Sequence, residues 1–275
     1  INEMIYKLRY KFNHQFKRSI TLQEGIGIGY ARNLALKEAE GDWILWLDSD
    51  NIISTNYIWN ALKEITIANA KTAVLYPRKI IPLYNKEIFK ERAIACYTML
   101  ISKQTIPRMN KGHSTKLPYT ATQGTICKTE ILRKIGGFNS YLIAAEDIDL
   151  FQRLLHHGYT MKHFDGKLYF FIRRTLRAWF KQAITWEYGK TLLTKQRNML
   201  SLELYKSKST IGKIHEFIIY TALMIQRLIK EAASFCGPLE AIAMPLIYIY
   251  RRAGYFSGRL YALKCISKKY SIEEL

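Results

Sequence analysis

Closely spaced cysteines, internal repeats and low-complexity segments are all missing from this sequence of 275 residues. The four cysteines are scattered, so no zinc site or redox motif of neighbouring cysteines is indicated. We expect reduced, buried thiols at Cys96, Cys127, Cys236 and Cys265. An uninterrupted apolar segment is also lacking over residues 1–18, where single apolar side chains lie between Lys and Arg. We therefore expect an amphipathic helix there and no secretory leader.

Acidic residues are few, because 22 Asp and Glu stand against 42 Lys and Arg, giving a net charge of +20. Hydrophobic residues make up 49% of the chain, which excludes a disordered tail and allows a sizeable core. Residues 1–150 hold 21 basic and 14 acidic side chains, whereas residues 151–275 hold 21 and 8. The basic excess indicates a negative partner, nucleic acid or an anionic membrane surface. Since the basic residues of the second half flank long apolar stretches, we expect the membrane surface and no nucleic acid.

The succession of apolar and polar segments predicts an α/β domain. A short strand over residues 19–24 and a glycine turn precede a helix that we expect to begin near Ala31 and to stop at Gly41. Residues 43–47 read WILWL, and this unbroken apolar run indicates a strand covered on both faces, as in parallel sheets. Further elements are predicted as a strand over 73–80, a strand leading into a short helix within 121–130, and a helix over 146–158 that ends at Gly158. The expected fold is a mixed, mainly parallel sheet flanked by helices.

From about residue 176 the sequence predicts long, basic, amphipathic helices. Residues 232–250 are mostly apolar but contain Glu240, Pro238 and Pro245, which are unusual together in a membrane span. Basic residues flank this stretch on both sides, so we favour a segment lying in the membrane interface. A true span, or a helix pair buried in a core or an oligomer, remains as an alternative.

Two carboxylates, Asp48 and Asp50, follow the predicted buried strand directly. In open α/β sheets ligands bind beyond the carboxyl ends of strands, so chemistry is expected at this point. Carboxylates spaced in this way suit a hard divalent cation that completes its shell with water and phosphate oxygens. The alternative is an ordinary solvated turn or a helix N-cap, where Asp and Ser are common.

The glycine turn Gly25, Gly27 and Gly29 departs from a dinucleotide fingerprint, because Tyr30 stands where a third glycine is needed. The helix after it would present free N–H groups to an anion. Arg32, in its first turn, adds a charged fork for a phosphate or for the nearby carboxylates.

A second acidic cluster, Glu146, Asp147 and Asp149, begins the predicted helix over 146–158. The helix dipole favours acidic residues in a first helical turn, so one explanation is that these residues only stabilise the start of the helix. As a functional group, a carboxylate at the mouth of a cleft can act as the general base for an attacking hydroxyl.

These segments together resemble glycosyltransferase family 2. The block GIGIGYARNLALKEAEGDWILWLDSDN is similar to the family's glycine turn, Ala-Arg-Asn helix and Asp-x-Asp motif. The block TQGTICKTEILRKIGGFNSYLIAAEDIDLFQRLLHHGY is similar to its Ile-Gly-Gly-Phe turn and Glu-Asp pair. The resemblance covers roughly residues 19–160 and implies a GT-A type, Rossmann-like catalytic domain. It also implies that the first strands of that domain are missing before Ile1.

The resemblance implies an inverting, metal-dependent transfer from a UDP- or GDP-sugar to a glycan or lipid-linked acceptor. Under it, Asp48 and Asp50 hold Mg²⁺ or Mn²⁺, Asp147 is the general base and Glu146 stands beside it. The donor-binding set is Arg32, Asn33, Asp48 and Gly124, and the wall next to the acceptor is formed by Gly136, Gly137 and Phe138. The downstream metal-binding His of many GT-A enzymes has no counterpart; His163 is nearest, and an ordinary His near a strand is preferred.

Two regions are expected, a catalytic domain over 1–170 and a basic, amphipathic, membrane-associated helical region over 171–275. Trp179, Trp186 and Tyr188 suit a membrane interface, with packing of their helix across the acceptor face as the alternative. We expect the protein at the cytoplasmic face of the cell membrane. The alternative function is a non-catalytic or degenerate transferase that acts as a peripheral membrane binding protein.

Overall fold

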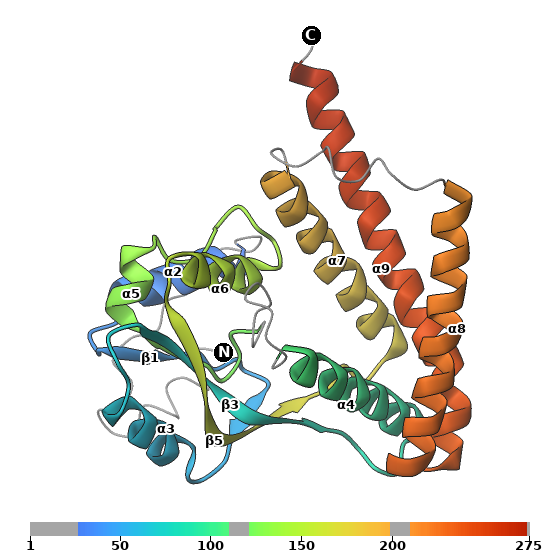
Figure 1. Cartoon of the computed structure of the whole chain (residues 1–275), viewed down its shortest axis with the longest axis horizontal. Helices are drawn as coiled ribbons and strands as arrows, with labels where there is room; N and C mark the ends of the chain where they lie inside the picture. The colour runs from blue at the N-terminus through green and yellow to red at the C-terminus, as the bar shows by residue number, and fades with distance from the viewer. Residues whose placement is uncertain (1–26, 110–120, 199–209, 274–275) are drawn as a thin grey trace, which may run out of the picture.

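The computed structural model describes residues 27–109, 121–198 and 210–273. The amphipathic helix expected over 1–18, the strand over 19–24 and Gly25 lie outside these ranges. Figure 1 shows a curled sheet with helices on both faces, and beside it a set of long helices. The fold is therefore a mixed α/β domain joined to a helical layer.

The sheet has the order β1-β4-β3-β5-β2. The strands are β1 (Trp43–Leu45), β2 (Asn51–Ile53), β3 (Thr72–Leu83), β4 (Ile126–Lys128) and β5 (Thr160–Phe171). The long β3 and β5 run parallel, but the other three pairings are antiparallel. The expectation of a mainly parallel sheet is wrong for the described strands. An apolar run predicts burial but carries no information on the direction of the partner strand, which the connections decide.

The run at residues 43–47 is less buried than predicted. All three residues of β1 are half-buried, Trp46 beyond the strand is buried, and Leu47 is 45% exposed. The reason is that β1 stands at one end of the described strand order and pairs with β4 alone there. The covered strand is instead β3, whose Val74 and Leu75 point to opposite faces and are both fully buried.

Helices cover both faces of this sheet. One face packs against α2 (Ile28–Glu38), α5 (Thr129–Lys134) and α6 (Glu146–His156), and the other against α3 (Tyr57–Thr66). The helix α2 begins three residues before the predicted Ala31, with Gly27 as its N-cap. The end of α6 is as predicted, because Gly158 follows it with φ +78°, a conformation that glycine adopts without strain.

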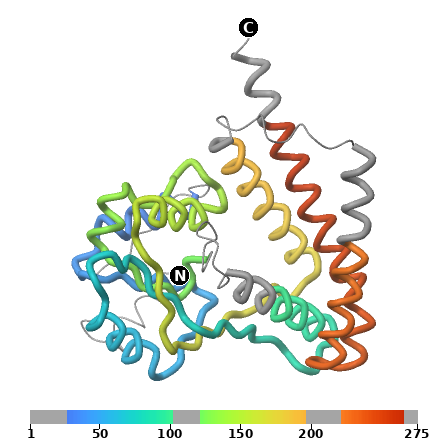
Figure 2. The backbone as a smooth tube through the Cα atoms, viewed as in Figure 1, coloured from blue at the N-terminus to red at the C-terminus, as the bar shows by residue number. Residues whose placement is uncertain are grey.

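The helical layer consists of α4 (Phe89–Met109), α7 (Leu176–Asn198), α8 (Thr210–Phe235) and α9 (Pro238–Glu273). Its core includes Leu100, Trp179, Leu228 and Met244, one from each helix. Residues 232–250 form the corner of a helix pair, in which α8 and α9 lie side by side in Figures 1 and 2. Within the described residues, no helix has both the length and the apolar content needed to cross a bilayer.

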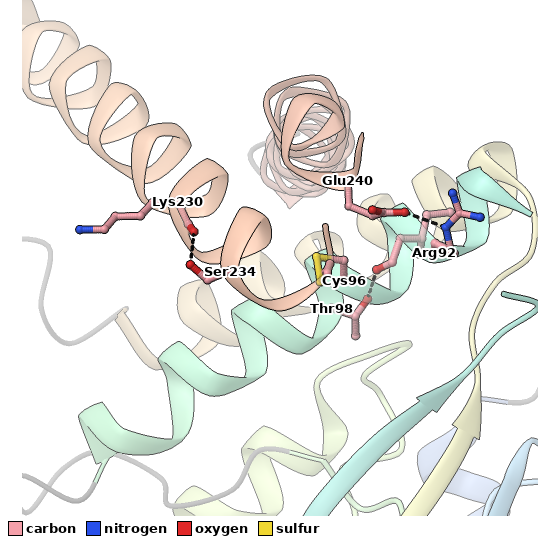
Figure 3. The surroundings of a disulfide bond; sticks show 8 residues. Arg92, Cys96, Thr98, Lys230, Ser234 and Glu240 are labelled. Atoms are coloured by element: carbon pink, nitrogen blue, oxygen red, sulfur yellow. Dashed lines mark hydrogen bonds and ion pairs between the residues drawn. A yellow bond between two sulfur atoms is a disulfide. The ribbon is translucent and has the colours of Figure 1, made fainter. Parts of the chain in front are cut away.

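A disulfide corrects one expectation from the sequence. Cys96 on α4 and Cys236 at the end of α8 are 140 residues apart and form a disulfide bond, whereas reduced thiols were expected. The fold brings them together because α4 packs against the corner between α8 and α9, as Figure 3 shows. Beside the bond, Arg92 donates to Glu240 at 2.7 Å, so two links join α4 to this corner. Cys127 and Cys265 are free.

The aromatic residues of α7 do not all face solvent as a membrane interface would require. Trp179 is only 4% exposed, because the buried guanidinium of Arg251 on α9 lies 4.7 Å from its ring. The same guanidinium lies 5.0 Å from the ring of Trp186, which is 44% exposed. The ring of Tyr188 lies tilted against the ring of Tyr261 on α9, with 5.4 Å between their centroids. The role at a membrane interface expected for Trp179 is therefore wrong, because its ring is buried between α7 and α9.

Candidate active site

The first acidic pair lies in the turn between β1 and β2. The backbone N–H of Asn51 donates to the carbonyl oxygen of Asp48 at 3.0 Å, which closes the turn. The Asn51 side chain donates to an oxygen of Asp50 at 3.0 Å. The side chain of Asp48 is 44% exposed, so its carboxylate can reach a ligand at the sheet edge.

Arg32 joins the two acidic blocks of the sequence. One of its terminal nitrogens donates to Glu146, and the other lies 3.4 Å from Asp48. The side chains of Arg32 and Glu146 are 13% and 6% exposed, so the charges of this pair are largely withdrawn from water. Arg32 thus contacts the nearby carboxylates, and binding of a phosphate by Arg32 stays a prediction. This contact brings the block around Asp48 and the block around Glu146 to one place.

Asp147 follows Glu146 in the first turn of α6. The pKa of its carboxyl is raised to about 7, first by burial and then by the nearby charge of Glu146, against the N–H of Ile148 and the charge of Arg32, which lower it. That N–H donates to the Asp147 carboxylate at 2.8 Å. A carboxyl with a pKa near neutral pH accepts a proton from a hydroxyl far better than an ordinary Asp does. The role of Asp147 as a general base stays a prediction, which this raised pKa favours.

Gly124 lies beside the turn that holds Asp48, because the N–H of Gly124 donates to the carbonyl oxygen of Trp46 at 2.7 Å. Its φ is +71°, and an added Cβ would come within 2.6 Å of the hydroxyl of Tyr57. That hydroxyl, fully buried, donates to the Gly124 carbonyl. Tyr57 was not predicted from the sequence as part of the site, because its only local signal is its place at the start of an amphipathic helix.

Asn33 joins α2 to the Ile-Gly-Gly-Phe turn. Its amide donates to the carbonyl of Phe138 at 2.7 Å and accepts from the N–H of Phe138 at the same distance. Gly137 has φ +67°, and an added Cβ would collide with the Asn33 side chain. The turn therefore requires glycine at position 137. The next residue, Phe138, packs edge-on against Trp46, with 5.1 Å between the ring centroids. Donor binding by Asn33 stays a prediction, as does an acceptor wall made by this turn.

The helix α7 holds the loop that leads into Asp147. An added Cβ at Gly189 would overlap the carbonyl of Ala144, so only glycine allows this approach. Leu193, one turn further along α7, packs against Leu142 and Ala145. Ala145, the N-cap of α6, adopts the left-handed φ of 68°, which a non-glycine residue holds only when its surroundings impose it. Gly189 carries no local sequence signal for this role, because its partner Ala144 lies 45 positions away.

The carboxylates present fit a divalent cation only in part. Among the described side chains no group of three or more His, Cys, Asp and Glu is arranged so that it could hold a metal ion. Asp48 and Asp50 would supply two oxygen ligands, and Mg²⁺ or Mn²⁺ bound to one or two carboxylates takes its remaining ligands from water and phosphate. His163 is exposed on β5, with Tyr76 beside its ring at 6.1 Å, and it behaves as an ordinary surface histidine.

Known proteins are similar to this chain in sequence and in fold. Its match to a pre-mycofactocin glycosyltransferase, found in two strains of Mycobacterium tuberculosis, is 28% identical over 155 residues, covering 56% of this chain and 32% of the relative. The chain therefore spans about a third of the length of these curated relatives.

In fold, the chain is similar to a mannosyltransferase from Pyrobaculum calidifontis solved with GDP-Man and Mn²⁺. The TM-score is 0.52 at 15% identity, over 94% of this chain and 74% of that one. In sequence, residues 43–264 match the family described as glycosyl transferase family group 2. That match covers most of the chain, including both acidic motifs and the helical layer up to residue 264, and the protein therefore belongs to glycosyl transferase family group 2.

Proposed function

We propose that this chain carries the catalytic centre of an inverting, metal-dependent glycosyltransferase. The observation that carries the proposal is the position of Arg32 between Asp48 and Glu146, which brings the Asp-x-Asp pair beside Asp147. Family membership supports the class of reaction, and the carboxyl of Asp147, with a pKa near 7, supports the choice of base.

In the proposed reaction an acceptor hydroxyl attacks the anomeric carbon of the donor sugar. Its oxygen forms the new glycosidic bond while the bond from that carbon to the diphosphate oxygen breaks. The proton of the hydroxyl passes to the carboxylate of Asp147, and the nucleoside diphosphate leaves with the electron pair. Attack from the face opposite the leaving group inverts the anomeric configuration.

The other residues of the centre position these groups. Arg32 pairs with Glu146 and holds the first turn of α6 against the Asp48 turn. Asp48 and Asp50 would bind a divalent cation, and such a cation neutralises the charge that develops on a leaving diphosphate. We assign a UDP- or GDP-sugar as donor and a glycan or a lipid-linked sugar as acceptor. The site of action proposed is the cytoplasmic face of the cell membrane.

Two substitutions test this proposal on the full chain. Asp147→Asn should abolish transfer and leave donor binding nearly intact, because the amide keeps the shape of the carboxyl but cannot take a proton. Asp50→Ala should weaken the binding of UDP and GDP in the presence of Mn²⁺, measured by calorimetry. Asp165→Asn, an exposed change on β5, is the matched control and should alter neither quantity.

The outcomes separate catalysis from binding alone. Unchanged turnover in Asp147→Asn refutes the assignment of the base. Tight binding of UDP or GDP without any transfer by the wild type, over a panel of donors and acceptors, favours a degenerate transferase. Donor binding and transfer by the wild type that do not depend on Mn²⁺ would refute the role of the Asp48 and Asp50 pair.

A further inference from the structure

The helix α9 carries a stripe of exposed apolar side chains, called here the outer stripe. Its members recur at alternating intervals of three and four residues, with the exposed Ala253 continuing the spacing. They are Leu239, Ile242, Leu246, Ile249, Phe256, Leu260 and Leu263. Ile242 and Leu246 are 75% and 74% exposed. A contiguous apolar row of this kind on a surface marks an interaction site.

The outer stripe takes no part in the core of the helical layer. The opposite side of α9 provides that contact, through buried residues such as Met244 and Tyr248 and through Gly258, which meets the backbone of α7. Two residues along a helix correspond to about 200°, so Met244 and Ile242 lie on nearly opposite sides. The helix is therefore apolar on two faces, and the fold uses one of them.

The charges beside the outer stripe are almost all positive. Arg252 and Arg259 are seven residues apart and follow one edge of the stripe, while Lys264 lies near its end. Over residues 221–265 the two acidic residues are Glu231 and Glu240. Glu231 accepts from Arg227 at 2.6 Å, and Glu240 is buried against Arg92, so both are engaged. The surface around the stripe is cationic.

We propose that the outer stripe of α9 lies in the interface of an anionic lipid bilayer, parallel to the membrane plane. Apolar side chains would enter the boundary between head groups and acyl chains, and Arg252 and Arg259 would meet the lipid phosphates. A second copy of this face is a poorer partner, because its cations would meet those of the first, whereas paired helices place opposite charges beside an apolar seam. This inference rests on the membrane location proposed above and not on the transfer reaction.

Vesicle flotation of the full chain tests the proposal. The wild type should float with vesicles in which about a third of the lipid is phosphatidylglycerol, and far less with pure phosphatidylcholine. The double variant Ile242→Ser, Leu246→Ser should lower the bound fraction on the order of ten-fold. Arg252→Gln with Arg259→Gln should remove most of the preference for anionic vesicles.

A matched control uses exposed apolar residues on the other part of the molecule. Trp59→Ser with Ile67→Ser, at side chains 62% and 69% exposed on and beside α3, should float as the wild type does. Equal flotation of the stripe variant and this control would overturn the proposal. So would a lipid-free dimer in analytical ultracentrifugation that the stripe substitutions dissociate.

Donor binding separates this inference from the proposed function. Calorimetry with UDP or GDP and Mn²⁺, without lipid, should give the same affinity for the stripe variant and the wild type. If the wild type binds the donor nucleotide but does not float with vesicles, only the membrane proposal is overturned. If the wild type floats with vesicles but does not bind the donor nucleotide, only the proposed transfer reaction is overturned.

Discussion

The raised pKa of Asp147 leads to a prediction with two independent readouts. In the folded protein this pKa is about 7, against an ordinary value of 3.8, so folding favours the protonated carboxyl. The resulting stabilisation is fully present below pH 3.8 and is lost as the pH rises through about 7. A difference of this size corresponds to at most ~4 kcal/mol. Water at the partly exposed side chain screens part of it, so we expect ~2 kcal/mol.

Asp147→Asn removes this titration. Because the amide does not ionise, the variant should be more stable than the wild type by ~2 kcal/mol at about pH 9, and the difference should shrink toward pH 4. Urea unfolding followed by circular dichroism at several pH values measures it. In catalysis, kcat/KM of the wild type should rise with pH up to about 7 and then level off, since the free enzyme needs the carboxylate. The variant should lose on the order of 10²–10⁴ in kcat/KM.

Two results would refute the reasoning. One is a wild-type profile of kcat/KM that is flat between about pH 5 and pH 8, measured with saturating Mn²⁺ and an acceptor that does not titrate there. The other is a stability difference between wild type and Asp147→Asn that does not change with pH. Asp165→Asn, whose carboxyl is exposed, serves as the control and should show neither effect.

Further substitutions test the supports of the site and of the fold. Gly189→Ala should lower kcat and leave the KM for the donor unchanged, because the methyl group displaces Ala144 and so Asp147; an unchanged kcat in steady-state kinetics would contradict it. Tyr57→Phe should cost ~1–3 kcal/mol in urea unfolding, since the Gly124 carbonyl loses a buried partner, and a loss below that range would show another donor there. Cys96→Ser should lower the free energy of unfolding by ~2–4 kcal/mol under oxidising conditions. In excess reductant the wild type loses the disulfide too, so the variant and the wild type should be equally stable. A wild type indifferent to reductant would mean that the bond does not stabilise the fold.

Local sequence predicted much of the α/β domain. The strand at Ala73–Ile80, the short strand and helix around Ile126, and the helix from Glu146 to its glycine stop are all confirmed. These elements are predictable because burial periodicity and helix termination depend on neighbouring residues. The two acidic motifs were also identified from local sequence, because carboxylates after a strand end, or in a first helical turn, are visible without a fold.

The tertiary structure decided how these pieces meet. Arg32 contacts carboxylates from both acidic motifs, a disulfide joins cysteines 140 residues apart, and Gly189 packs against the loop before Asp147. Likewise, the sequence placed strands but not their directions, and the structure made three of the four pairings antiparallel. Such contacts depend on the packing of distant segments, whose energies are summed over many side chains. The sequence by itself determined which groups are available for chemistry, and only the fold determined which of them lie together.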